Sequence, residues 1–244
     1  MDTVEPLSDD TRNLLTHVST ATITTRLFSR GLRNTFLHGL SVLGEYRGNM
    51  VGPAVTLRYI PAREDLDVLS VFQDYDHPQR KVIEQTAAGS VLVMSCRGSD
   101  RAASAGEILM TRLHFLGACG VVTDGSLRDS RGIESLPLAA YVKSRSPMTN
   151  LTLHHAVDIN VPIGCAEVPV YPGDVMVGDA DGVVCIPRHL ADEVAREAME
   201  QESVESFILE RVKAGSPLRG TYPPNEETMR QYHAHLARGE GGGA

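Results

Sequence analysis

Arg128, Asp129 and Glu107 are the residues of this 244-residue chain whose types and positions best suit chemistry on an anionic substrate. An arginine can bind a carboxylate through two parallel hydrogen bonds. Aspartate and glutamate supply the hard oxygen ligands that Mg²⁺ prefers. A metal held by them could polarise a keto oxygen and stabilise an enolate. Alternatively, Arg128 and Asp129 form a common surface ion pair, and Glu107 only interacts favourably with the dipole of a helix from its first turn.

The predicted elements around these residues would bring them together. An apolar run at 90–96 predicts a strand, a helical pattern runs from Gly106 to near Gly117, and 120–125 predicts the next strand. In open α/β sheets, ligands collect at the carboxyl ends of strands and the amino ends of helices. Gly106–Glu107 at the start of the predicted helix and Arg128–Asp129 after the strand at 120–125 are the two halves of one sequence motif, and both fall at such places.

The start of the predicted helix adds a second group of donors. The backbone amides of Glu107, Ile108 and Leu109 have no partner inside the helix, so they could hold a carboxylate with the help of the helix dipole. Gly106 precedes them and is included in the predicted substrate-binding set.

Composition narrows the class of protein. Hydrophobic residues make up 42% of the chain and charged residues 22%, as in ordinary globular domains. The net charge of −8 argues against binding to a nucleic-acid backbone. No stretch is long and apolar enough to span a membrane, and the acidic start lacks a signal core, so we expect a cytoplasmic protein. The four cysteines form no CxxC pair, which favours buried free thiols over zinc or disulfides.

Strands and helices alternate along the chain without a strict repeat. Helices are predicted at 7–17, 19–31, 77–88, 106–117, 189–213 and 225–238. Strands are predicted at 51–60, 67–72, 90–96, 120–125 and 138–143, and 161–187 is predicted to be mostly β. This mixture predicts a layered α/β fold with a mixed sheet. We expect one domain over 1–238, with a core at about 19–215 and a C-terminal helical extension, and a disordered tail at 239–244.

Five segments together resemble a known family. They are Gly106–Glu107, Arg128–Asp129, the apolar flank 121–127, the Tyr-Pro-Gly-Asp turn at 171–174, and the Asp-Ala-Asp-Gly-Val turn at 179–183. This pattern resembles the RraA-like family. That family includes the class II 4-hydroxy-4-methyl-2-oxoglutarate/4-carboxy-4-hydroxy-2-oxoadipate (HMG/CHA) aldolases and the regulators of ribonuclease E.

The resemblance implies a fold and an activity. The fold would be a swivelling α/β/β/α sandwich with mixed sheets, assembled as a homotrimer or a homohexamer with the site between subunits. The activity would be a divalent-metal-dependent cleavage of 4-hydroxy-2-oxo acids, or decarboxylation of oxaloacetate, to give pyruvate. The cofactor would be Mg²⁺ or Mn²⁺.

The resemblance also implies residue roles. Asp129 would bind the metal directly or through water, and Glu107 would order metal-bound water. Arg128 would bind the pyruvyl part and help stabilise the enolate, and the amides of Ile108 and Leu109 would hold its carboxylate.

An acid from a neighbouring subunit's C-terminal helix would complete the metal site in the aldolases of this family. The best match is Glu205, with Glu202 and Glu200 as close alternatives on the same glutamate-rich helix. A solvent-exposed role suits any of the three equally well.

Two functions of different classes follow from the resemblance. One is the metal-dependent lyase, and the other is a catalytically inert regulator that binds a ribonuclease or another protein. Position 107 separates them, because the regulators typically have glycine there, and Glu107 therefore favours the enzyme. Arg97 could bind a second substrate carboxylate or pair with an acid at the surface, and we favour the surface role.

Overall fold

The computed structural model describes residues 7–239. The α-helices are α1 (Asp9–Leu15), α2 (Thr20–Ser29), α3 (Pro78–Gln85), α4 (Glu107–Phe115), α5 (Ser130–Ser135), α6 (Ala191–Lys213) and α7 (Glu226–Ala237). The 3₁₀ helices are η1 (Leu69–Gln73), η2 (Asn150–Thr152) and η3 (Arg188–Leu190). The strands are β1 (Ser41–Val42), β2 (Met50–Pro61), β3 (Val91–Ser95), β4 (Ala103–Ala105), β5 (Gly120–Leu127), β6 (Ala139–Arg145), β7 (His154–Ile159), β8 (Ile163–Cys165), β9 (Val168–Val170), β10 (Val175–Gly178) and β11 (Val183–Ile186).

One mixed sheet organises the molecule. Its strand order is β1-β6-β5-β3-β2-β10-β11, with β4 added beside β5 and β7 beside β2. Strands β2, β3, β5 and β6 run parallel, while β10, β11, β7 and β1 join antiparallel. Every residue of β3 and β5 is buried, as expected of parallel strands covered on both faces. The predicted mixed α/β fold is confirmed.

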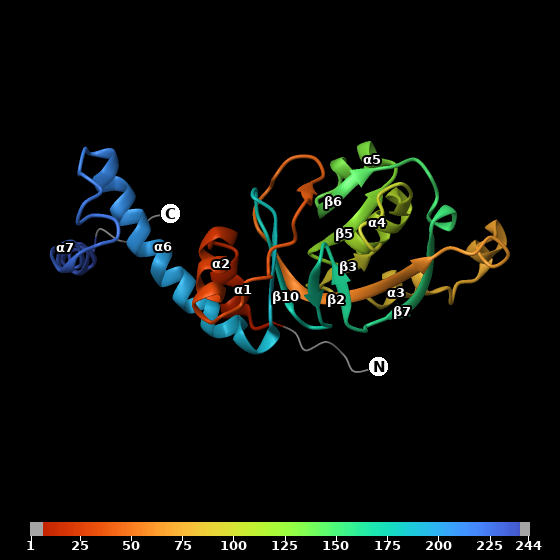
Figure 1. Cartoon of the computed structure of the whole chain (residues 1–244), viewed down its shortest axis with the longest axis horizontal. Coiled ribbons are helices and arrows are strands. Elements are labelled where there is room, and N and C mark those ends of the chain that lie inside the picture. Colours follow the sequence, from red (N-terminus) through yellow and green to blue (C-terminus); the bar gives the residue numbers. More distant parts are fainter. Residues whose placement is uncertain (1–6, 240–244) are drawn as a thin grey trace.

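Three hydrophobic clusters hold this sheet. One lies under α3 and α4, where Met110 and Leu113 of α4 are fully buried. A second lies between the sheet and the β8–β9 hairpin. The third joins α1, α2 and the first half of α6 to β10 and β11. Figure 1 shows the rest of α6 extending away from the sheet, with α7 beside its far end and α4 and α5 on the opposite side of the molecule.

The aspartates of the turns at 171–174 and 179–183 stabilise these turns through hydrogen bonds. The Asp179 carboxylate accepts hydrogen bonds from the amide and hydroxyl of Thr20 (2.7 and 2.9 Å) and from the amides of Asp181 and Gly182. It therefore ties the start of α2 to the β10–β11 turn. Asp174 similarly accepts from the amides of Tyr171 and Arg188, fixing the turn before β10.

The predicted strand at 67–72 is wrong, because the chain forms η1 there. The segment follows the end of β2 at Pro61 and pairs with no strand of the described chain. Its amides bond locally instead, from Val71 to the Val68 carbonyl (3.0 Å) and from Asp74 to the Val71 carbonyl (3.1 Å). Leu69 is left 74% exposed.

The other predicted helices and strands are confirmed within a few residues at each end. Gly239 lies in a turn after α7, and the rest of the predicted tail, 240–244, lies outside the described residues. None of the helices within 7–239 is both long and apolar enough to cross a bilayer.

Candidate functional site

The pairing of β4 with β5 places the two halves of the sequence motif side by side. Ala103 and Ala105 of β4 lie opposite Ser126 and Leu127 at the end of β5, and the amide of Arg128 donates to the Ala105 carbonyl (3.1 Å). The start of α4, which follows β4, therefore lies beside the residues that follow β5. Sequence analysis did not predict β4, because its Ala-Ser-Ala sequence has no strand signal of its own.

A side chain at Gly106 would displace the side chains of Asp129 and Arg128. A Cβ built there would lie 2.7 Å from Oδ2 of Asp129 and 3.0 Å from Nε of Arg128. The φ angle of Gly106 is −134°, so close approach rather than backbone conformation requires glycine. The side chains of Arg128 and Asp129 thus lie directly against the start of α4.

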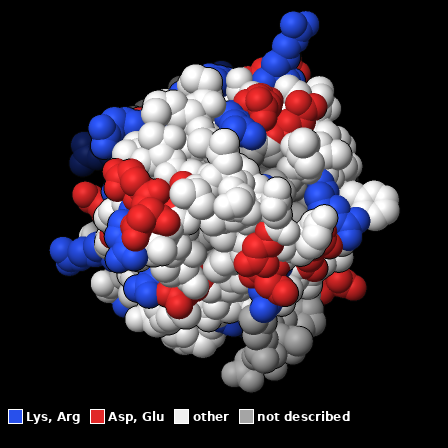
Figure 2. Space-filling model, turned by 90° about the vertical axis from the view of Figure 1, so that its right-hand side faces the viewer, with Lys and Arg blue, Asp and Glu red and all other residues white. Residues whose placement is uncertain are grey.

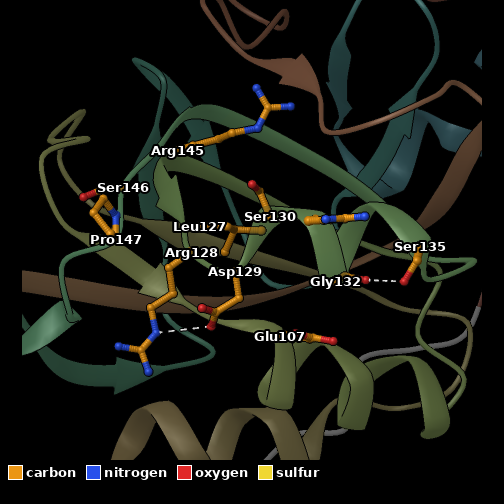
Figure 3. Close-up of a pocket in the computed structure, with 11 residues that line it drawn as sticks. Glu107, Leu127, Arg128, Asp129, Ser130, Gly132, Ser135, Arg145, Ser146 and Pro147 are labelled. Carbon is orange, nitrogen blue, oxygen red and sulfur yellow. Dashed lines mark hydrogen bonds and ion pairs between the residues drawn. The ribbon is translucent and has the colours of Figure 1, made fainter.

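Asp129 has a left-handed backbone conformation, with φ 57° and ψ 38°. Residues other than glycine seldom adopt it, and such strain is typically kept where function needs it. Asp129 stands at the N-cap of α5, yet its side chain makes no capping hydrogen bond. Its Oδ2 lies 3.5 Å from Nε of Arg128 instead (Figure 3). Because both side chains are about half exposed, this pair contributes little stability.

Glu107 reaches the same region from the first turn of α4. Its carboxylate lies against Gly132 of α5, where an added Cβ would overlap the carboxyl group. A surface cavity of about 790 Å³ is lined by Glu107, Arg128 and Asp129 together, and Figure 3 shows the three side chains around it. The structure therefore brings together the three predicted catalytic residues.

The predicted substrate-binding residues line a second, neighbouring cavity. This cavity of about 300 Å³ is bordered by Gly106, Ile108, Leu109, Arg128 and Asp129. No side chain caps α4. Its first-turn amides therefore remain available to an anion at the cavity wall.

The same cavity contains polar residues that sequence analysis missed. Arg80 and Gln79 from the first turn of α3, and Asn150 from η2, line it together with Phe72. Burial lowers the pKa of Arg80 below its ordinary value, and the positive charge of Arg128 lowers it further. The sequence carried no signal for this group, because its members come from separate segments that meet only in the fold.

The three glutamates predicted for the C-terminal helix do not reach this site within one chain. They lie on α6, which extends away from α4 and α5 (Figure 1). Glu205 accepts a hydrogen bond from Gln201 (2.7 Å), whereas Glu202 accepts from the backbone and hydroxyl of Ser19 at the start of α2. Glu200 is exposed.

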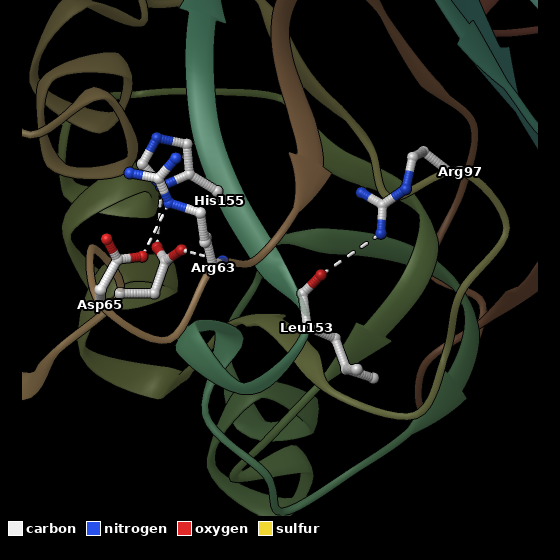
Figure 4. Close-up of polar contacts among 6 residues, drawn as sticks. Arg63, Asp65, Arg97, Leu153 and His155 are labelled. Atoms are coloured by element: carbon white, nitrogen blue, oxygen red, sulfur yellow. Dashed lines mark hydrogen bonds and ion pairs between the residues drawn. The ribbon is translucent and has the colours of Figure 1, made fainter.

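Arg97 lies outside both cavities. It donates to the Leu153 carbonyl (3.3 Å) rather than to an acid, as Figure 4 shows. The predicted acid partner is therefore wrong, although the surface location is correct. Elsewhere on the surface, Nδ1 of His155 lies 2.8 Å from the buried carboxylate of Asp67.

All four cysteines are free, as predicted, and three of them are buried. Burial raises the pKa of Cys96 to about 12. This thiol is neutral near pH 7 and unsuited to nucleophilic or metal-binding chemistry.

Metal binding would depend on Asp129 and Glu107. Within residues 7–239, no three His, Cys, Asp or Glu side chains group closely enough to hold a metal by themselves. In that same part of the chain, Glu107 makes no hydrogen bond or ion pair through its carboxylate, so its oxygens are free. Two accessible carboxylates fit Mg²⁺ or Mn²⁺, which take oxygen ligands and keep positions for water and substrate.

Known proteins include relatives of this chain in sequence. A protein of Thermus thermophilus named 4-hydroxy-4-methyl-2-oxoglutarate aldolase is 31% identical over 119 residues, covering 49% of this chain and 71% of that protein. A Halalkalibacterium halodurans protein that carries the same name provisionally is 31% identical over 154 residues, covering 63% of this chain and 67% of its own length.

Solved structures show the same fold. The crystal structure of RraAS2 from Streptomyces coelicolor, described as an unusual member of the RNase ES inhibitor RraA family, aligns with a TM-score of 0.74. It is 28% identical, and the alignment covers 83% of this chain and 97% of RraAS2. The RraA-like family model, described as Aldolase/RraA, matches residues 18–185. With its fold and both halves of its motif in place, the chain belongs to the Aldolase/RraA family.

Proposed function

We propose that this protein is a divalent-metal-dependent lyase that releases pyruvate from 4-hydroxy-2-oxo acids of the HMG/CHA type, or from oxaloacetate. The observation that carries the proposal is the convergence of Arg128, Asp129 and Glu107 at the first turn of α4. The aldolase names of the relatives support the same class of reaction.

Arg128 and the start of α4 would bind the part of the substrate that becomes pyruvate. The guanidinium would hold the 2-oxo acid carboxylate through a bidentate contact, and the amides of Ile108 and Leu109 would donate to it from the adjacent wall. This double contact would fix the plane of the 2-oxo acid relative to the bond that breaks.

Asp129 and Glu107 would hold Mg²⁺ or Mn²⁺, and Glu205 of another subunit would add a further oxygen. The bound cation would supply Lewis-acid polarisation of the 2-oxo group.

Cleavage breaks the bond between C3 and C4 in either substrate. In the aldol substrate, Glu107 would accept the C4 hydroxyl proton through an ordered water, and the carbonyl product would leave. In oxaloacetate, carbon dioxide would leave from the same position. Both reactions give the pyruvate enolate, whose charge Arg128 would stabilise until C3 is protonated. One site could therefore perform both reactions.

The proposal is tested by assaying a panel of 4-hydroxy-2-oxo acids and oxaloacetate, with pyruvate coupled to lactate dehydrogenase. We expect pyruvate with Mg²⁺ or Mn²⁺ present, loss of the activity with EDTA, and recovery when the metal is restored. Turnover that resists the chelator would contradict the metal requirement. No pyruvate from any substrate would favour a protein-binding regulator.

A further inference from the structure

Gly132 is a glycine inside a helix whose backbone does not require one. It is the third residue of α5, and its amide donates to the Asp129 carbonyl (3.0 Å) as part of the first helical turn. Its φ angle is not in the positive range that favours glycine. Glycine in a helix lowers stability relative to alanine, because it loses more backbone entropy on folding. The conformation of α5 therefore gives no reason for a glycine at this position.

The space beside Gly132 is occupied by the end of the Glu107 side chain. A Cβ built at position 132 would overlap the carboxyl carbon and both carboxylate oxygens of Glu107, which are the three atoms nearest to it. No backbone atom is among these three. Both residues line the cavity of about 790 Å³ (Figure 3). A side chain at position 132 would therefore compete with the Glu107 carboxylate for the same place.

The Glu107 carboxylate, and not the helix pair, would give way in that competition. Ile133 of α5 is buried in the same hydrophobic cluster as Met110 and Leu113 of α4, so the two helices are packed together. Separating them would open a cavity, which is costly. Glu107 is exposed, and within residues 7–239 no hydrogen bond or ion pair holds its carboxylate. This side chain can turn toward solvent at little cost.

We propose that Gly132 is a positioning residue, which keeps the Glu107 carboxylate at the wall of the 790 Å³ cavity by leaving its place unfilled. The inference rests on the proposed function, which assigns Glu107 to the metal and to an ordered water. Gly132 acts only through Glu107. A larger residue would strengthen α5 and displace the carboxylate, so its effects on stability and on the site have opposite signs.

Isothermal titration calorimetry with Mn²⁺ and no substrate tests this role separately from catalysis. We expect G132A to bind Mn²⁺ about tenfold more weakly than the wild-type protein, as is typical when a residue that orients a metal-binding side chain is changed. The melting temperature of G132A should be equal to or above that of the wild-type protein, because alanine favours the helix. A residue needed only for the fold would give a lower melting temperature.

A matched control accounts for the replacement of a glycine as such. Gly164 of β8 also lies in a regular element without a positive φ angle, and an added Cβ there meets no atom within 4 Å. G164A should therefore keep the wild-type affinity for Mn²⁺.

A double variant assigns the effect to Glu107. E107A removes the carboxylate through which Gly132 is proposed to act, and leaves nothing for a Cβ at position 132 to displace. The Mn²⁺ affinities of E107A and E107A/G132A should therefore agree within about twofold, because two residues that act through one contact are not additive.

The outcomes separate this inference from the proposed lyase. Wild-type Mn²⁺ affinity in G132A, a melting temperature of G132A well below the wild-type value, or a further tenfold loss on adding G132A to E107A would each overturn the positioning role. Weaker Mn²⁺ binding by stable G132A, without pyruvate release from any substrate by the wild-type protein, would support the positioning role and overturn the lyase. No Mn²⁺ binding by the wild-type protein would overturn the metal site and the role of Gly132 with it.

Discussion

Gly106 shows how the site depends on a missing side chain. Arg128 and Asp129 approach the start of α4 so closely that a Cβ at position 106 would lie 2.7 Å from the Asp129 carboxylate. Sequence analysis included Gly106 in the motif because it directly precedes Glu107. The sequence could not show that Arg128 and Asp129, which follow a different strand, approach this glycine closely in the fold.

Substituting Gly106 with alanine tests this geometry. We expect G106A to reduce pyruvate release at least about 100-fold, because small displacements of catalytic groups are costly. The fold should persist, with little change in melting temperature. Gly164 offers the matched control, since an added Cβ there meets no atom within 4 Å, and G164A should remain active. Equal activity of the two variants would contradict the proposed arrangement.

His154 gives a second residue-scale prediction, on stability. It is fully buried, and burial lowers its pKa from the ordinary value of 6.5. The unfolded chain therefore binds its proton more tightly than the folded protein. Its contribution to stability is present above about pH 6.5 and is lost as the pH falls below that value.

Thermal unfolding between about pH 8 and pH 5 measures this effect. The wild-type melting temperature should fall more steeply on acidification than that of H154Q, which can still donate to the Ala102 carbonyl. Parallel curves for the two proteins would show that His154 does not contribute.

Capping residues and residue composition predicted most helices and strands. The two segments that were predicted wrongly or missed, 67–72 and 103–105, depend on whether a neighbouring strand pairs with them in the fold. The helix predicted at 19–31 is α2, and Ser19 at its start is the N-cap, where its hydroxyl accepts from the amide of Thr22 three residues later. Residues 67–72 have strand-like composition but pair with no strand of the described chain, and Leu69–Gln73 form η1. Residues 103–105 lack that composition and still form β4, because β5 offers an edge.

Glu202 connects two elements that are far apart in the sequence. Its Oε1 accepts from the amide and hydroxyl of Ser19 (3.0 and 2.7 Å) and from the hydroxyl of Thr22 (2.8 Å). A carboxylate at this helix start is favoured by the dipole of α2. In the folded chain Glu202 therefore anchors the middle of α6 to the start of α2 and is a poor choice for a residue that reaches another site.

Replacing Glu202 with alanine should lower the free energy of unfolding by about 1–3 kcal/mol, since several hydrogen bonds to a charged group are lost. Chemical denaturation measures the change. Glu200 lies on the same helix and is exposed, so E200A controls for helix propensity and should have little effect. Equal stability of E202A and E200A would show that the contact with α2 contributes nothing.

At the scale of the molecule, the projecting α6 and the exposed apolar side chains suit an assembly of several chains. Leu69, Tyr75 and Ile108 are 74%, 88% and 84% exposed, and Ile108 borders the 300 Å³ cavity. On the face shown in Figure 2, acidic and basic side chains are interspersed around a broad uncharged area. The predicted trimer or hexamer would cover such surfaces and would bring an acid of α6 to a neighbouring site.

Mixing two inactive variants tests this shared site. R128A and E205Q should each be nearly inactive alone. In an equal mixture, about half of the chains keep Arg128 and about half keep Glu205. If each site takes Arg128 from one chain and Glu205 from another, random reassembly should make about a quarter of the sites complete and restore about a quarter of the wild-type rate. Light scattering should give a mass three or six times that of one chain. No recovery from mixed and reassembled variants would contradict a site completed by Glu205 of a second chain.

The most direct test of the central claim is metal-dependent pyruvate release by R128A. Arg112 lies on α4 and pairs with Glu84 at the surface, so R112A is the control for loss of an arginine. With Mg²⁺ and either oxaloacetate or a 4-hydroxy-2-oxo acid, we predict pyruvate from the wild-type protein and R112A, and at least about a 1,000-fold slower release from R128A. Unchanged turnover by folded R128A would contradict the site that Arg128, Asp129 and Glu107 are proposed to form.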